Sequence, residues 1–165
     1  MDGFVTGKSR AAGAPVDVLV AEDGTEYTEN LSRFCADGFA FTRAGDGGEA
    51  LSLLGTRTFD LVFLDMRFDR VQAGVLLGDV AETAERFNGD PVRARQFLEE
   101  HQGAYILAAI RAAGHTLPAV FSHDFDGEPR RWANLVRLYA PVSYLPDNAA
   151  PSAIRETFLR ATDRV

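Results

Sequence analysis

The sequence has little of what disulfides, cysteine-bound metals and membrane spans require. Cys35 is its one cysteine, so an intramolecular disulfide and a metal site built from cysteines are both excluded. No apolar run approaches the roughly 18 residues that a membrane span needs. The opening stretch 1–14 has no apolar segment long enough for a secretory signal. Together these absences predict a cytoplasmic protein.

Lysine is nearly absent. Lys8 is the one lysine among the 17 basic residues, and all the others are arginines. It lies in the segment 1–14, which is rich in Gly, Ala and Ser and lacks periodicity, so we expect this segment to be a flexible lead-in. Chemistry that needs a lysine from the folded body, predicted to be 15–165, is therefore excluded.

The charge balance is acidic. The formal net charge is -7, so DNA, RNA and anionic membranes should repel the chain. Its 165 residues, 46% of them hydrophobic and 25% charged, suit one globular domain rather than a disordered chain. We therefore expect a single domain with neither nucleic acid nor membrane among its partners.

Short apolar runs alternate with helical patterns along the chain. Five of these runs are predicted to be strands, at 16–21, 39–44, 59–64, 117–122 and 142–145. Helices are predicted at 25–37 (with Thr25 as cap), 49–54, 127–140 and 151–164. This alternation indicates an α/β fold in which helices cover both faces of a five-stranded parallel sheet.

The chain between the third and fourth strands is long. Residues 69–90 show roughly helical spacing. Asp90 caps a further helix. We predict that this helix runs unbroken to Gly114, because it contains no helix breaker other than Gly103. The segment 69–102 is then a helical insertion. It is either a surface elaboration or, because its apolar stripes need covering, a partner or dimerisation surface.

Polar residues follow the predicted strands. Glu22 and Asp23 come after the first strand and Asp65 after the third, and the later strands end near Ser122, His123 and Asp147. In an open parallel sheet these ends meet at one edge, where loops leave a crevice. Three carboxylates in one crevice would repel each other, and a hard cation such as Mg²⁺ relieves that repulsion. The alternative is that they are ordinary polar residues at strand ends.

Four stretches resemble the receiver domains of two-component response regulators. They are VLVAEDG with its acidic pair, FDLVFLDMR with one aspartate at the end of the central strand, LPAVFS ending in a hydroxyl residue, and VSYLPD. The resemblance covers residues 16–67 and 103–164. It implies a flavodoxin-like fold and a place in a phosphorelay.

The resemblance also implies residue roles. Asp65 would be the phosphoacceptor, because an aspartate can attack phosphorus when a metal neutralises the incoming charge. Ser122 would be the hydroxyl that moves to bind the phosphoryl group, and Tyr144 the aromatic switch residue. The implied Mg²⁺ ligands are Asp23, Asp65, the backbone carbonyl of Arg67 and, through a water molecule, Glu22.

One position departs from the family. Receivers carry a lysine three residues beyond the switch aromatic, where it pairs with a phosphoryl oxygen, but here that position holds Asp147. A carboxylate turned into the site would oppose phosphorylation by about 1–4 kcal/mol at a surface-like dielectric. Arg67 or another arginine could substitute for the lysine, although its planar fork does not directly replace an ammonium. The alternative to an inward carboxylate is that Asp147 turns outward as part of a loop.

We therefore expect a signalling module, not an enzyme, that contacts a sensor kinase or other signalling proteins, with homodimer formation as a further option. In one version Asp65 accepts a phosphoryl group, and in the other the domain is a phosphorylation-independent pseudo-receiver scaffold. The rival from another class is a small metal-dependent hydrolase or flavodoxin-like binder that uses the same crevice. For that rival His123 is the one evident general base.

Overall fold

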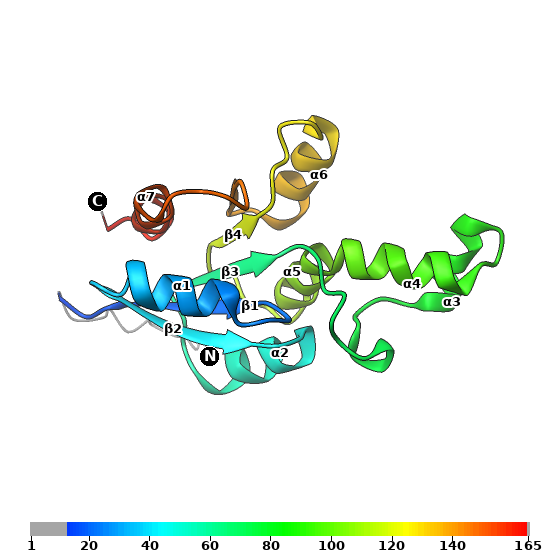
Figure 1. Ribbon diagram of the computed structural model, residues 1–165, viewed down its shortest axis with the longest axis horizontal. Helices are drawn as coiled ribbons and strands as arrows, with labels where there is room; N and C mark the ends of the chain where they lie inside the picture. Colours follow the sequence, from blue (N-terminus) through cyan, green and yellow to red (C-terminus); the bar gives the residue numbers. More distant parts are fainter. Residues whose placement is uncertain (1–12, 165) are drawn as a thin grey trace, which may run out of the picture.

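The computed structural model describes residues 13–164, so the predicted flexible lead-in falls almost entirely outside the described residues. Five strands form one parallel sheet in the order β2-β1-β3-β4-β5 (Figure 1). They are β1 (Val16–Ala21), β2 (Phe39–Ala44), β3 (Leu61–Asp65), β4 (Ala119–Ser122) and β5 (Val142–Leu145). The predicted α/β fold is confirmed, although β3 and β4 begin later than the apolar runs suggested.

Helices cover both faces of the sheet (Figure 1). They are α1 (Glu26–Phe34), α2 (Gly47–Thr56), α5 (Gln102–Ala112), α6 (Pro129–Tyr139) and α7 (Pro151–Ala161). One buried cluster joins α2, α5 and α6 to the sheet and includes Ile106 and Phe121. The other joins α1 and α7 to the opposite face and includes Leu31, Phe63 and Phe158. Because β3 is buried on both faces, its sequence is a nearly continuous apolar run.

The insertion, residues 69–102, forms an arm at one end of the molecule. Its elements are η1 (Ala73–Val75), α3 (Val80–Ala84), η2 (Glu85–Phe87) and α4 (Pro91–Glu100). Figure 1 shows α3 and α4 side by side, beyond the carboxyl ends of the strands. Asp90 caps α4 as predicted, since its Oδ1 accepts the N–H of Val92 at 2.9 Å. No helix within the described residues is long and apolar enough to cross a bilayer.

The predicted continuous helix up to Gly114 is wrong, because the chain breaks at His101 into α4 and α5. The first residues after β3 bond to the backbone at the break. Met66 O accepts the N–H of Gly103 at 3.0 Å, and the Phe68 N–H donates to Glu99 O at 2.8 Å. These hydrogen bonds to β3's extension replace helix hydrogen bonds that the break removes, so tertiary contacts decide where the helix is interrupted.

Candidate functional site

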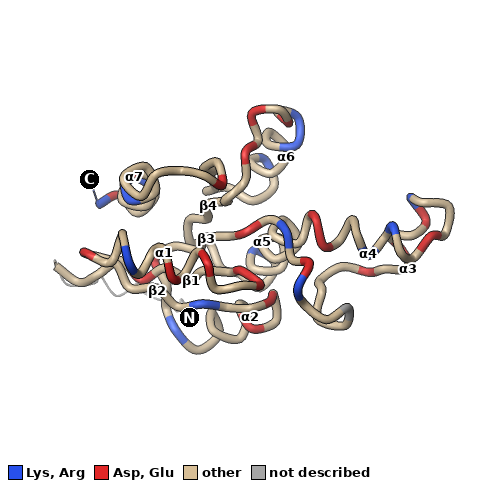
Figure 2. The backbone as a smooth tube through the Cα atoms, viewed as in Figure 1, with Lys and Arg blue, Asp and Glu red and all other residues tan. Residues whose placement is uncertain are grey.

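The carboxyl ends of β1, β3 and β4 meet at one edge of the sheet. Asp65 at the end of β3 pairs in register with Ser122 at the end of β4. The pocket there has a volume of about 270 Å³ and is lined by Tyr27, Asp65, Met66, Arg67, Ser122, His123, Asp124 and Asp147. Figure 2 shows acidic stretches near the ends of β1 and β3 and a basic stretch in the segment that follows β3. We call this hollow the Asp65 pocket.

Asp65 is the most perturbed carboxyl group of the pocket. Burial, and then the negative charge of Asp23, raise its pKa to about 7, and Glu22 adds to the rise. The backbone N–H groups of Met66 and Arg67 donate to Asp65 and partly offset these effects. The predicted acidic residues are therefore near enough to repel one another, as the convergence of strand ends requires.

Glu22 is committed to helix α1. It is 1% exposed, and its two carboxylate oxygens accept the N–H of Tyr27 at 3.0 Å and both the N–H and hydroxyl of Thr28, at 2.6 and 2.7 Å. Thr25 is the N-cap residue of this helix, as predicted, but its side chain makes no capping hydrogen bond. Glu22 serves the free N–H groups instead, where a carboxylate also suits the helix dipole.

Asp23 contacts an arginine from the insertion. The backbone N–H of Arg70 donates to Asp23 Oδ2 at 2.9 Å, and Arg70 Nε lies 3.8 Å from Oδ1. The guanidinium also pairs with Glu26 at 2.8 Å. From β2, Arg43 donates to the carbonyls of Asp23 and Gly24. Two arginines therefore hold the acidic loop after β1, and the side chain of Asp23 is left only 2% exposed.

The donor set bears on the expected Mg²⁺. Within the described residues, no group of three or more His, Cys, Asp or Glu side chains is arranged to hold a metal ion. Asp23 and Asp65 remain as two carboxylates with mutual repulsion, and Arg67 lines the same pocket as Asp65. Two carboxylates, a carbonyl and water molecules make a ligand set that Mg²⁺ accepts. Glu22 does not join them directly, because its oxygens are occupied by α1.

Two hydroxyl groups meet in the Asp65 pocket. Ser122 is 4% exposed, and its Oγ donates to the hydroxyl of Tyr27 at 2.7 Å. Burial, and further the charges of Asp65, Asp147 and Glu22, raise the pKa of the Tyr27 phenol, while its hydrogen bond with Ser122 opposes the rise. At neutral pH the phenol therefore keeps its proton and can donate it.

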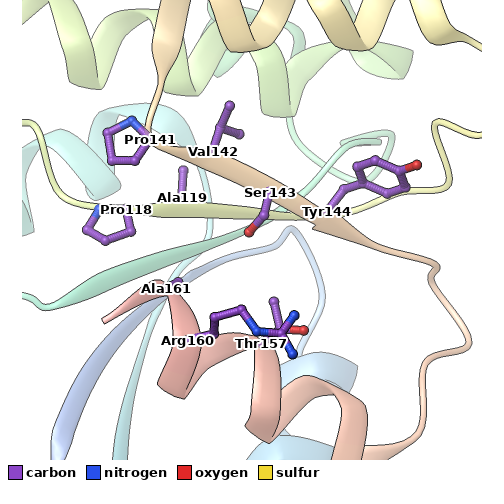
Figure 3. A pocket seen from close by; sticks show the side chains of 9 residues that line it. All are labelled: Pro118, Ala119, Pro141, Val142, Ser143, Tyr144, Thr157, Arg160 and Ala161. Carbon is purple, nitrogen blue, oxygen red and sulfur yellow. The ribbon is translucent and has the colours of Figure 1, made fainter. Parts of the chain in front are cut away.

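Tyr144, predicted as the switch residue, does not line the Asp65 pocket. Its ring packs on Trp132 and Phe125, with centroids 4.7 and 5.3 Å away, and its hydroxyl donates to Asp126. Figure 3 shows the side chains of Tyr144 and Val142 pointing away from α7, and both residues line a separate hollow between β5 and α7. That hollow of about 300 Å³ has no carboxylate in its lining, so it does not share the chemistry of the Asp65 pocket.

The pocket is poor in positive charge. Asp147 lies in the exposed turn after β5, yet it lines the pocket. It is therefore neither turned fully away from the site nor buried in it. Among the described residues that line the pocket, Arg67 is the one arginine. It pairs with Asp69 at 3.0 Å, and its side chain is 63% exposed.

Tyr27 and Arg70 are not among the residues that the sequence predicted for the site. Tyr27 could have been found, because a helix that starts directly after the acidic loop carries its first-turn side chains past the same strand ends. No sequence signal pointed to Arg70. It reaches Asp23 from the insertion, across a sequence separation of 47 residues.

Comparison with solved structures gives the fold a context. The receiver domain of a Francisella response regulator superposes with a TM-score of 0.61 at 18% identity, covering 90% of this chain and 97% of that one. The receiver domain of NtrX from Brucella abortus gives 0.60 at 19%, covering 90% and 100%. The chain has the fold of a response-regulator receiver domain. A receiver domain of a Syntrophus aciditrophicus histidine kinase agrees, with a TM-score of 0.60 at 15% identity and coverage of 93% and 92%.

This receiver fold is the one that the sequence resemblance implied. No protein-family model matches the sequence, and no curated protein compared with it matches either. Identities below a fifth carry the architecture alone, so the roles of individual residues depend on the geometry of the Asp65 pocket.

Proposed function

We propose that this chain is a receiver-type signalling module of a phosphorelay in which Asp65 accepts a phosphoryl group. The observation that carries the proposal is the Asp65 carboxyl at the end of the central strand. It is desolvated beside Asp23 and lies in a pocket with the Ser122 hydroxyl. A sensor kinase would be the phosphodonor in the cell, and the signal would pass through protein contacts in the cytoplasm, with homodimer formation as one form of contact.

The chemistry is a direct displacement at phosphorus. With acetyl phosphate as donor, one Asp65 oxygen attacks phosphorus and forms an acyl-phosphate bond. The bond between phosphorus and the acetyl oxygen breaks, and its electron pair leaves with acetate, so no proton changes hands. Ser122, which pairs in register with Asp65 on the neighbouring strand, can then donate to the phosphoryl oxygens.

Mg²⁺ belongs to the same proposal. Asp23, Asp65 and the carbonyl of Arg67 would hold it, and its charge would neutralise the repulsion between the incoming phosphoryl group and these carboxylates. The charge of the ion would also lower the proton affinity of Asp65 and so keep this nucleophile ionised at neutral pH. Arg70 competes for Asp23, so the ion has to bind beside a guanidinium that is already present.

The test of the proposed function is intact mass after incubation with acetyl phosphate and Mg²⁺. We expect a gain of one phosphoryl group that disappears in Asp65→Asn and when EDTA replaces Mg²⁺. Asp124→Asn, which neutralises another carboxyl group of the same pocket, is the matched control and should still gain the mass. A wild-type protein without any gain would exclude the phosphoacceptor role.

One alternative has an observation in its favour. Among the described residues that line it, the pocket has Asp147 and no lysine, and Arg70 already pairs with Asp23, which together suit a pseudo-receiver scaffold that works without phosphate. In that case the mass experiment fails, while binding to partner proteins is the same for wild type and Asp65→Asn. The metal-dependent hydrolase has less support, because His123 is engaged with Glu128 at 2.9 Å. Metal-dependent turnover lost in Asp65→Asn would favour it.

A further inference from the structure

The Asp65 pocket faces a shortage of hydrogen-bond donors. A phosphoryl group on Asp65 would bring several charged oxygens into a space already bordered by Asp124 and Asp147. Arg67, the one arginine among the described residues of the lining, pairs its guanidinium with Asp69. Neutral donors held in place by the fold are therefore the groups left to receive the phosphoryl oxygens.

Tyr27 is held as such a donor. Its backbone N–H is fixed by the buried carboxylate of Glu22 at 3.0 Å. Its ring packs edge-on against Phe63 of β3, with centroids 5.5 Å apart and an interplanar angle of 83°. These two contacts direct the hydroxyl into the Asp65 pocket, where it meets Ser122 at 2.7 Å.

The hydroxyl pair has a proton to spare. When Ser122 donates to the Tyr27 oxygen, the phenolic O–H is free to donate to another acceptor. Among the described residues, neither hydroxyl makes a further side-chain hydrogen bond that would occupy it. A phosphoryl group on Asp65 would be a strong acceptor for this proton, because Asp65 lies on the strand next to Ser122.

We propose that the Tyr27 hydroxyl, together with Ser122, binds the phosphoryl group on Asp65 and takes the part that a lysine plays in other receivers. The inference rests on the proposed function. A phenol supplies a directional hydrogen bond but no charge, so it would stabilise the transferred group less than an ammonium would. We therefore expect slow phosphorylation that depends on Tyr27.

The experiment measures the initial rate of mass gain with acetyl phosphate and Mg²⁺. Tyr27→Phe removes one oxygen and keeps the ring contact with Phe63. We expect it to slow the reaction about tenfold or more, the usual effect of losing a hydrogen bond to a charged group. Tyr105→Phe makes the same chemical change on α5, beside a different hollow, and should leave the rate unchanged. Urea unfolding of both variants checks that the fold is intact.

A double-mutant cycle with Ser122→Ala separates direct contact from positioning. If Tyr27 touches the phosphoryl group, Tyr27→Phe slows the reaction in the presence and in the absence of the Ser122 hydroxyl. An effect that vanishes in the Ser122→Ala background would mean that Tyr27 only positions Ser122, and it would overturn the inference. A faster reaction in Tyr27→Phe would overturn the inference too, because the Tyr27 hydroxyl would then restrain Ser122 and slow the reaction.

The two proposals fail differently. Mass gain in the wild type with an unchanged rate in Tyr27→Phe overturns the role of Tyr27 and leaves the phosphoacceptor role of Asp65 intact. No mass gain in the wild type overturns both.

Discussion

Asp65 shows how a single residue can carry a cost in stability. In the folded protein burial and the charge of Asp23 favour its protonated form and raise its pKa to about 7, whereas in an unfolded chain an aspartate titrates near its ordinary pKa of about 4. Between these two values the folded state holds a proton that the unfolded state has lost. Stability contributed by this group is therefore present at low pH and lost as the pH rises through about 7.

We predict that Asp65→Asn stabilises the metal-free protein above neutral pH. Between pH 5 and pH 8 the wild type should lose about 1–3 kcal/mol more free energy of unfolding than the variant does. Urea unfolding in EDTA at the two pH values measures the difference. Asp37→Asn changes an exposed carboxyl group and serves as the control. Equal pH dependence in wild type and Asp65→Asn would show that Asp65 is not desolvated.

Glu22 is the opposite case, a buried carboxylate that stabilises the fold. Three donors from the start of α1 meet its two oxygens, and one of those donors belongs to Tyr27. We predict that Glu22→Gln costs about 1–3 kcal/mol of unfolding free energy, because the amide NH₂ would face an N–H group and leave it unsatisfied. Glu29→Gln, an exposed change on the same helix, should cost much less.

Measured by urea unfolding in EDTA, the sign separates two roles. A residue that serves only a metal would stabilise the metal-free protein when its charge is removed. A stabilising Glu22→Gln would therefore contradict the assignment of Glu22 to α1.

At the scale of the elements, α5 packs closely against the end of β3. Gly103, in its first turn, lies against the end of β3, and a Cβ added there would come within 2.3 Å of Asp65 O. Gln102 beside it is 1% exposed and bonds both to Leu77 of the insertion and to Leu98 of α4. The insertion and β3, the strand that ends at Asp65, are therefore joined through the start of α5.

Gly103→Ala should reverse the usual sign of a glycine-to-alanine change in a helix. Alanine normally stabilises a helix by about 0.5–1 kcal/mol over glycine, but here the new methyl group would push against the backbone of Asp65. We predict a loss of at least about 1 kcal/mol in unfolding free energy. Gly55→Ala, within α2 and with nothing near its added Cβ, should be neutral or stabilising. Equal effects at the two positions would contradict the close approach of α5 to β3.

The Arg70 contact joins the insertion to the acidic loop and bears on metal binding. We predict that Arg70→Gln tightens the binding of Mg²⁺ about two- to fivefold, the range expected for one ion pair whose arginine is exposed to solvent. Isothermal titration calorimetry measures the affinity, and Arg93→Gln, an exposed change on α4, is the control. Weaker binding in Arg70→Gln would mean that the arginine assists the ion rather than competing with it.

At the scale of the whole molecule, charge limits the choice of partners. The formal net charge is -7, and Figure 2 shows acidic and basic residues interspersed along the backbone. We predict no shift in fluorescence anisotropy of a labelled DNA duplex at low ionic strength, because counterion release needs a basic surface. Saturable binding that weakens steeply with salt would contradict this prediction and would indicate a basic binding site.

The layout of the fold follows from the pattern of residues along the chain. Apolar runs that alternate with amphipathic helices leave little choice but a covered parallel sheet, and Asp65 had to lie at its carboxyl edge with Asp23 and Ser122 near it. Local patterns also placed the Asp90 cap correctly. These features depend on neighbours along the chain or on the direction of the strands, which a sequence contains.

The partners of the side chains at the site depend on packing between segments that are distant in the sequence. This packing assigned Glu22 to α1 and Arg70 to Asp23, and it brought Tyr27 to Ser122 across a separation of 95 residues. It also broke the long helix at His101, where hydrogen bonds from the chain after β3 meet the backbone. Such contacts arise between surfaces that meet when the chain closes, and the free energy of those surfaces is not written in the periodicity of either segment.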